Sequence, residues 1–345
     1  MPATTPLAVI TGLSGLRLTD RERDFFREIS PFGFILFGRN VDTPAQVRAL
    51  CDSLRETTGR DDTPILIDQE GGRVQRLKAP HWAPRPPGEV FGRLFERNPE
   101  AGAEALRLNT RLIARDLTAL GIDTDCLPVL DVRHPGAHDV VGDRAFSTDP
   151  KTVSRLGRIV IDTLLDNGVF PVMKHIPGHG RSECDSHDAL PRVTCSHDDL
   201  TRSDLVPFSD LRDCPFAMTA HIVYTACDSE QPATLSAEVI RSVIRGQCGF
   251  DGLLMTDDLS MKALSGTMES RTRASLDAGC DLILHCNGAM DEMTAVARTA
   301  RPMDAPALER WERAKARRAK APADFDAAGA QRALDLLLEQ DTVRS

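Results

Sequence analysis

The sequence lacks the cysteine patterns of disulfide frameworks and of structural zinc sites. Its nine cysteines are an odd number and are scattered along the chain without any Cys-x-x-Cys pair. This argues against both kinds of cross-link and favours reduced thiols in a reducing compartment. Cys280 and Cys286 flank apolar runs, so we expect them to be small buried hydrophobic side chains.

Long apolar runs and an excess of basic charge are also missing. No window approaches the roughly 20 apolar residues of a membrane span, and the first residues lack the basic segment of a secretory signal. The 42 Lys and Arg residues against 51 Asp and Glu residues give a net charge of −9, which repels phosphate backbones and anionic membranes. We therefore expect a cytoplasmic protein with no nucleic-acid partner and no membrane partner.

Short apolar runs that predict β-strands recur through the whole chain. Their apolar residues are continuous rather than alternating, which is typical of strands that are buried on both faces in a parallel sheet. The eight predicted strands are Leu7–Leu13, Phe32–Gly38, Pro64–Ile67, Leu127–Val132, Val169–Met173, Phe216–Ala220, Gly252–Thr256 and Asp281–Cys286.

Helical segments with recognisable start signals lie between these runs. Thr19 and Glu22 have the spacing of a capping box, and Thr43 followed by Pro44 predicts an N-cap and a first-turn proline. Strands that alternate with helices predict an α/β fold, a single (β/α)8 TIM-type barrel domain over residues 1–345 with C-terminal helices. A doubly wound sheet is the alternative, but no Gly-x-Gly-x-x-Gly follows the first strand.

A basic segment lies within the predicted C-terminal helices. Six basic residues fall between Arg310 and Lys320. They could form a nucleic-acid arm, but in an acidic protein they favour a solvated helix face.

Polar residues collect at the predicted carboxyl ends of the strands, where a β/α barrel gathers its chemistry. Any one of them could be a helix cap, an ion pair or a buried histidine, but six strand ends of eight together predict an active site. These positions are Asp68 to Arg76, Gly142 to Arg144, Lys174-His175, His221, Asp257-Asp258 and His285 to Asn287.

The segment from Lys174 to His187 is the densest of these. Its proline and two glycines predict a mobile loop over the barrel mouth. Asp185 lies two residues before His187, so its carboxylate could orient the imidazole and stabilise its protonated form. Zinc bound by His175, His179 and His187 is an alternative, but Lys174 would then stand beside the metal, so we expect no metal.

Long motifs in this chain resemble glycoside hydrolase family 3, and specifically its bacterial β-N-acetylglucosaminidases. The resemblance runs from about Gly33 to Asn287, and Ile176 and Thr256 depart from the residues common in the family. The matching segments are Ile35 to Asn40, Asp68 to Arg76, Gly142 to Phe146, Lys174 to Gly180 with Asp185 to His187, and Leu254 to Met261.

The resemblance implies a retaining exo-enzyme of cell-wall recycling. It would remove a β-linked N-acetylglucosamine from muropeptides that carry 1,6-anhydro-N-acetylmuramic acid, a small-molecule substrate. It also implies a cytoplasmic protein without cofactor or metal, and we expect a monomer. A β-glucosidase specificity and phosphate as the acceptor stay open.

The resemblance also implies roles for individual residues. Asp257 would be the nucleophile, and His187, oriented by Asp185, would be the acid/base. We expect Asp258 to point away and to cap the following helix, although Asp257 could itself be only a cap. The residues that match those gripping the terminal sugar are Asp68, Arg76, Arg144, Lys174 and His175.

Two other classes of function are compatible with the residues alone. One is a phosphate-handling aldolase in which Lys174 forms a Schiff base, and the other is a binding module that has lost turnover. For the hydrolase we further predict gating: without ligand, the loop from Ile176 to His187 should be displaced, with a hinge at Gly178, because the acid/base lies on a loop and the nucleophile on a strand.

Overall fold

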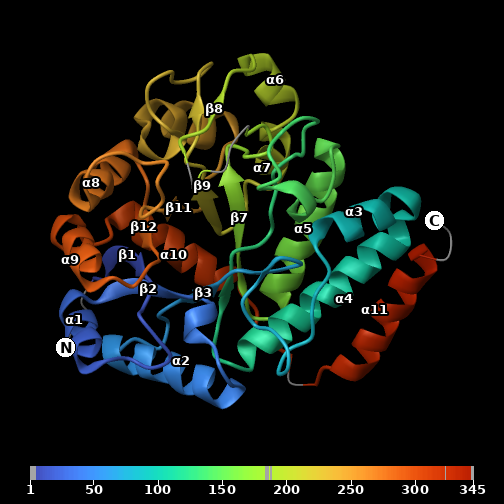
Figure 1. Cartoon of the computed structure of the whole chain (residues 1–345), viewed down its shortest axis with the longest axis horizontal. Helices are drawn as coiled ribbons and strands as arrows, with labels where there is room; N and C mark the ends of the chain where they lie inside the picture. The colour runs from blue at the N-terminus through green and yellow to red at the C-terminus, as the bar shows by residue number, and fades with distance from the viewer. Residues whose placement is uncertain (1–4, 183–185, 187–188, 323, 343–345) are drawn as a thin grey trace.

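The computed structural model describes residues 5–182, 186, 189–322 and 324–342. Eight parallel strands within this part form a closed barrel surrounded by helices (Figure 1). In chain order they are β1 (Leu7–Thr11), β2 (Pro31–Leu36), β3 (Ile65–Ile67), β6 (Thr124–Asp125), β7 (Phe170–Ile176), β9 (Phe216–Thr219), β11 (Leu253–Asp258) and β12 (Leu282–His285).

Pairing of β1 with both β2 and β12 closes the barrel, in the register Ile10–Gly33 and Ile10–Leu284. This confirms the predicted β/α barrel. The predicted fourth strand, Leu127–Val132, is wrong: β6 is formed by Thr124 and Asp125, two fully buried polar residues that a search for apolar runs passes over. Pro128 has no N–H to donate to a ladder. The predicted segment still bonds to β7 through the carbonyls of Leu127 and Pro128 and the N–H of Leu130, but these bonds form an isolated bridge at Val129 and not a strand.

Helices follow the strands around the barrel. Thr19 forms the predicted capping box with Glu22, and the side chain of Thr43 caps the helix that begins at Pro44, so both start signals are confirmed. The helices are α1 (Asp20–Ile29), α2 (Pro44–Thr58), α3 (Gly88–Arg97), α4 (Pro99–Thr118), α5 (Pro150–Asp166), α6 (His197–Arg202), α7 (Leu205–Asp210), α8 (Met268–Ala278), α9 (Met290–Thr299), α10 (Ala305–Arg317) and α11 (Ala327–Thr342), with a π-helical segment, η4 (Val239–Gln247).

Short strands and 3₁₀ turns lie in the loops at the carboxyl ends of the barrel strands. A hairpin of β4 (Gln69–Gly71) and β5 (Val74–Gln75) follows β3, and β8 (Arg192–Val193) pairs in parallel with β10 (Val223–Tyr224). Single 3₁₀ turns are η1 (Gly38–Asn40), η2 (Gly142–Arg144) and η3 (Ala233–Leu235). These pieces shape the loops that carry most of the predicted site residues.

Helix α10 covers the amino-terminal end of the barrel, behind the strands in Figure 1. Its Trp311 packs on Phe32, Phe170 and Phe216, which begin three of the strands, with ring centroids 5.1, 5.2 and 6.1 Å apart. Trp311 is buried, so this aromatic cluster fills the bottom of the barrel.

The basic residues from Arg310 onward are not simply a solvated face, so that expectation is corrected. Their side chains pair with carboxylates that stand just before barrel strands, because α10 lies across those strand ends. The pairs are Arg310 with Asp251 and Asp281, Arg313 with Asp251, Lys315 with Asp62, Arg317 with Asp213, and Arg318 with Asp123.

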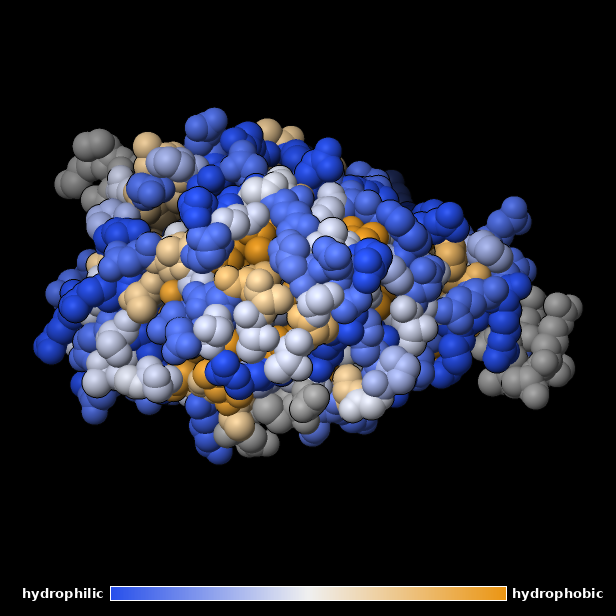
Figure 2. Space-filling model, turned by 90° about the horizontal axis from the view of Figure 1, so that it is seen from above, coloured by the Kyte–Doolittle hydropathy of each residue, from blue (hydrophilic) through white to orange (hydrophobic). Residues whose placement is uncertain are grey.

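The outer surface is mainly polar. Figure 2 shows one face on which hydrophobic atoms gather in separate patches among hydrophilic ones. Among the described residues, the large hydrophobic side chains that are exposed are Leu16, Leu190 and Leu336. Cys280 and Cys286 are buried, as predicted. No described helix combines the length and the hydropathy needed to cross a bilayer.

Candidate active site

A pocket of about 160 Å³ opens at the carboxyl ends of the barrel strands. Its lining includes every described residue that the sequence assigned to the site: Asp68, Arg76, Arg144, Lys174, His175 and Asp257. These residues come from four different segments of the chain, and the closed barrel brings them together. Ile35, Met218 and Leu284 add apolar wall to the same pocket.

Asp257 lies near the end of β11 and lines the pocket. Its Oδ1 accepts a hydrogen bond from the backbone N–H of Asp258, at 2.8 Å. The Asp258 carboxylate is bound to Ser260 and to the backbone N–H of Cys286. Asp258 therefore caps the turn after β11 and ties it to the end of β12. It does not cap a helix, because α8 begins only at Met268.

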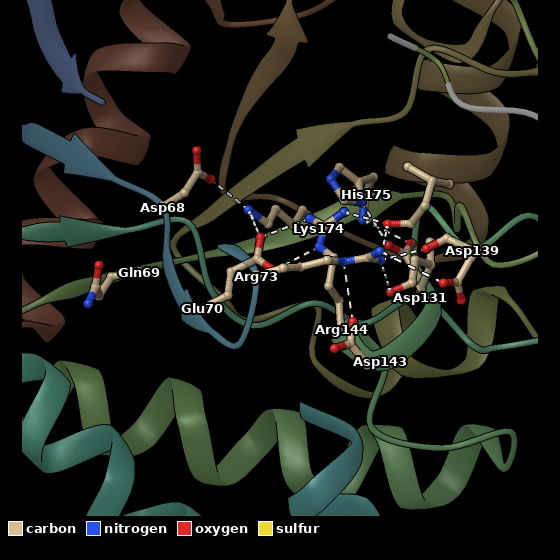
Figure 3. A network of polar contacts seen from close by, with 12 residues as sticks. Asp68, Gln69, Glu70, Arg73, Asp131, Asp139, Asp143, Arg144, Lys174 and His175 are labelled. Carbon is tan, nitrogen blue, oxygen red and sulfur yellow. Dashed lines mark hydrogen bonds and ion pairs between the residues drawn. The ribbon is translucent and has the colours of Figure 1, made fainter. Parts of the chain in front are cut away.

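A chain of alternating charges forms one wall of the pocket, with Lys174 at its centre (Figure 3). The Lys174 Nζ lies 2.8 Å from Asp68 Oδ1 and 2.6 Å from Glu70 Oε1. Arg144 donates two hydrogen bonds of 2.8 Å to Glu70, and Arg76 donates one of 3.0 Å to Asp68. The side chains of Lys174 and Glu70 are only 2% and 4% exposed, so this wall is a desolvated ionic network.

The network shifts the pKa values of Asp68, Glu70, Arg144 and Lys174 toward their charged forms. Burial alone would raise the pKa of Asp68 and Glu70, but the neighbouring cations outweigh it, so the pKa of Glu70 falls to about 2 and that of Asp68 is also lowered well below its usual range. Burial likewise opposes the charge of Lys174, yet the two carboxylates raise the pKa of its ammonium. A Schiff-base lysine needs a free amine, so this environment argues against the aldolase alternative.

His175 is oriented by a buried carboxylate that sequence reasoning missed. Asp131 is fully buried. Its carboxylate accepts a hydrogen bond of 2.7 Å from His175 Nδ1, and it also accepts hydrogen bonds from the backbone N–H groups of His175 and His179. Burial would raise the pKa of Asp131, but the histidines and these hydrogen bonds lower it. A carboxylate accepts only, so Nδ1 of His175 carries a proton, and His175 is fixed in this orientation while it lines the pocket.

The start of the predicted mobile loop is packed in place. Residues 176–182, apart from the partly exposed Arg181, are buried. The hydroxyl of Tyr224 donates to the carbonyl of Gly178 at 2.7 Å. A side chain on Gly180 would collide with the carbonyl of Val132, and Gly178 has a φ of +131° beside Asp204. These glycines lie in close packing at the start of the loop. The hinge at Gly178 and the displacement of the loop stay predictions, because residues 183–185, 187 and 188 lie outside the described part of the chain.

His179 lines the pocket beside this turn. Burial and the neighbouring His175 lower the pKa of its imidazole to about 4, so the ring is neutral near pH 7. Its Nε2 lies 3.2 Å from Ser186 Oγ, the hydroxyl of the residue between the two members of the predicted acid/base pair. Asp185 and His187 themselves lie outside the described residues, and so do the predictions about them.

The zinc alternative cannot be assembled from the described part of the chain. No three His, Cys, Asp or Glu side chains there are grouped so that they could hold a metal ion. His187, the third ligand of that alternative, lies outside the described residues.

The missed residues had a signal in the sequence. Glu70 stands inside the segment Asp68 to Arg76, and Asp131 is the last residue but one of the predicted fourth strand, Leu127–Val132. Both are polar residues at a strand end, which is the criterion that found the others. Neither was singled out, because which strand-end side chains meet depends on the curvature of the loops.

Comparisons with known proteins agree with this site. The family described as "Glycosyl hydrolase family 3 N terminal domain" matches residues 13–311. A beta-hexosaminidase of Alkalilimnicola ehrlichii is 41% identical over 284 residues, covering 81% of this chain and 80% of the relative. One of Bordetella avium is 36% identical over 286 residues, covering 82% and 81%.

A solved structure gives the same result for the fold. NagZ from Neisseria gonorrhoeae in complex with N-trifluoroacetyl-D-glucosamine superimposes with a TM-score of 0.86 at 30% identity, covering 98% of this chain and 99% of the other. The match extends over the whole barrel and the C-terminal helices. The chain therefore belongs to glycosyl hydrolase family 3 and is a β-N-acetylhexosaminidase of that family.

Proposed function

We propose that this protein is a retaining exo-β-N-acetylglucosaminidase of cell-wall recycling, which removes the terminal N-acetylglucosamine from muropeptides that carry 1,6-anhydro-N-acetylmuramic acid. The observation that carries the proposal is the shared pocket, which is lined by Asp257 and by the network of Asp68, Lys174, Glu70 and Arg144. The N-acylglucosamine bound to the related NagZ supports the sugar class.

The charged wall suits the terminal sugar. Sugar hydroxyls both donate and accept, and charge-assisted hydrogen bonds from fixed ions are stronger than neutral ones. Lys174 and Arg144 would donate to hydroxyl oxygens, and Asp68 would accept from hydroxyl hydrogens. Because these side chains already hold one another, they bind the sugar without being reorganised. A wall behind the sugar makes the enzyme exo-acting.

Hydrolysis would proceed in two steps. Asp257 attacks the anomeric carbon and forms a covalent glycosyl ester, while His187, oriented by Asp185, protonates the leaving oxygen. The same imidazole then removes a proton from the water that cleaves the ester. One group can serve both steps because the unperturbed pKa of an imidazole lies near neutrality. No step in this scheme uses a metal or a cofactor.

The first experiment is incubation with 4-nitrophenyl N-acetyl-β-glucosaminide and then with the anhydro-muropeptide. We expect release of nitrophenol from the first and of free N-acetylglucosamine from the second, with the β-anomer formed first in the NMR spectrum. Internal fragments released from a long chitooligosaccharide would contradict exo-action. Formation of the sugar phosphate in phosphate buffer would show a phosphorolytic acceptor instead of water.

The proposal also covers the setting of the reaction. We propose that the protein acts as a monomer in the cytoplasm on this small-molecule substrate. Sedimentation at several protein concentrations and fractionation of the source cells test these two points.

A further inference from the structure

The strand that carries Asp257 loses its regular backbone pairing just before that residue. On one side, β11 pairs with β9 from Leu253 to Met255. On the other side, its pairing with β12 shifts in register between Met255 and Asp258. Asp257 therefore lies on a β-bulge, which redirects a side chain but removes main-chain groups from the ladder.

Three side chains take over the hydrogen bonds that the ladder no longer makes. Thr256 Oγ1 accepts from the backbone N–H of Leu284 at 2.9 Å, and Asp258 Oδ1 accepts from that of Cys286 at 3.1 Å. Both of these bonds tie β11 to β12. On the opposite flank, His221 Nε2 lies 3.0 Å from the carbonyl oxygen of Asp258.

The hydrogen bonds of His221 define its tautomer. A carbonyl can only accept, so Nε2 carries the proton and Nδ1 of the neutral ring is an acceptor. Thr234 Oγ1 lies 2.7 Å from Nδ1 and 3.2 Å from the carbonyl oxygen of Ala220, so its one proton goes mainly to the nearer acceptor, Nδ1. Thr219 Oγ1 lies 2.8 Å from Thr234 Oγ1 and can donate in turn. All three side chains are fully buried. This hydrogen-bond relay, from Thr219 through Thr234 and His221, ends on the carbonyl of Asp258, next to Asp257.

We propose that His221 is a positioning residue that fixes the nucleophile by holding the main chain of the Asp257–Asp258 bulge. The proposal rests on the proposed role of Asp257. His221 follows β9 in the sequence. The backbone pairing of β9 with β11 ends at Met255, and beyond that point the imidazole of His221 connects the two segments. Without the imidazole of His221, the buried carbonyl of Asp258 loses its hydrogen-bond donor, and the main chain of the bulge can shift and move Asp257.

The test compares His221→Leu with His221→Gln. Leu removes the donor, whereas the Gln amide can still donate to the Asp258 carbonyl. We expect kcat/KM to fall about 10²-fold in His221→Leu, as for a nucleophile displaced by about 1 Å, with KM nearly unchanged. His221→Gln should recover most of this loss.

A series of aryl N-acetyl-β-glucosaminides separates this effect from a defect in proton donation. A misplaced nucleophile slows attack on every substrate, so the loss in His221→Leu should be the same for good and poor leaving groups. A loss that grows with the pKa of the leaving phenol would overturn the proposal, because it would place His221 in the acid/base step.

His285→Leu is the matched control. His285 is also a fully buried histidine at a strand end, but the hydrogen bond of its ring is made to Glu292 on α9 and not to the main chain of the bulge. We expect a similar loss of Tm in the two Leu variants and a loss of kcat/KM in His221→Leu alone. Equal kcat/KM in both folded variants, or no recovery in His221→Gln, would overturn the inference.

Two further variants keep the outcome decisive. If His221→Leu does not fold, Thr234→Val is the substitute, because it removes only the hydroxyl that donates to His221 Nδ1. We expect a smaller loss of kcat/KM that is again the same for good and poor leaving groups. An unchanged kcat/KM in Thr234→Val would then refute the hydrogen-bond chain from Thr219 to Asp258. If Asp257→Ala stays active, the proposed nucleophile has failed. An inactive Asp257→Ala beside a fully active His221→Leu would reject only the positioning role.

Discussion

The two ends of the barrel both carry ion pairs, but in opposite surroundings. At the amino-terminal end, Arg313 and Asp251 pair with side chains that are 48% and 63% exposed, over an aromatic plug. At the carboxyl end, Lys174 and Glu70 pair at 2% and 4% exposure. Water screens the first pair and weakens it, whereas the second pair is desolvated at a high cost in free energy. The first end packs the bottom of the barrel, and the second lines the pocket that we propose binds the sugar.

If the carboxyl end of the barrel serves catalysis and the amino-terminal end serves stability, the largest effect should come from a substitution that abolishes catalysis without lowering stability. Asp257→Ala should lower kcat by about 10⁴-fold or more, because no glycosyl ester can form. The Tm should stay close to that of the wild type. Hydrolysis of the nitrophenyl glycoside together with a thermal unfolding scan measures both. Activity within tenfold of the wild type would remove Asp257 from the role.

The next effect concerns proton donation at the same end. His187→Ala should slow hydrolysis of a natural disaccharide by about 10²- to 10⁴-fold, the range for general acid–base catalysis. It should slow an aryl glycoside with a good leaving group much less, because that group departs without a proton. Asp185→Ala should give a smaller defect of the same kind. Equal losses on both substrates would mean that His187 only binds or shapes the site.

The amino-terminal end should show the reverse pattern. Trp311→Ala leaves a cavity among Phe32, Phe170 and Phe216, so we expect a loss of about 3–5 kcal/mol in the free energy of unfolding. Urea denaturation gives this value. The kcat/KM of the folded fraction should be unchanged, and a selective loss of activity would show that the two ends are coupled.

A pH series sharpens the contrast between exposed and buried carboxylates. The pKa of Glu70 is lowered from 4.5 to about 2 in the folded protein, so the unfolded chain binds more protons as the pH falls between these values. Glu70 therefore contributes stability that is present above pH 4.5 and is lost toward pH 2. We expect Glu70→Gln to flatten this decline in urea denaturation. Glu309→Gln, at an exposed position of α10, is the control for removing one carboxyl group.

The smallest effect is expected for a single exposed ion pair. Arg313→Ala should change the free energy of unfolding by less than about 1 kcal/mol, and less still at high salt. Urea denaturation at two salt concentrations measures it. A loss of several kcal/mol would mean that α10 is held by its charges as much as by Trp311.

The sequence was a good guide wherever a signal is local. The capping box at Thr19, the N-cap at Thr43 and seven of the eight strands were found because caps, prolines and apolar runs act within a few residues. The fourth strand was missed because Thr124 and Asp125 are polar residues that only a surrounding barrel can bury. Gly178 suggested a hinge, which stays a prediction; the structure adds that this glycine packs against Asp204, and a glycine has the same sequence signature whether it permits motion or close packing.

The sequence by itself determined the barrel, its family and the polar character of the strand ends, since these depend on periodicity and on long motifs. Only the tertiary structure decided which of those polar side chains meet. Lys174 lies between Asp68 and Glu70, Asp131 reaches His175, and His221 reaches the strand of Asp257. These contacts join residues up to 106 positions apart, and their geometry follows from the closure of the barrel and the bulge in β11, neither of which leaves a local trace in the sequence.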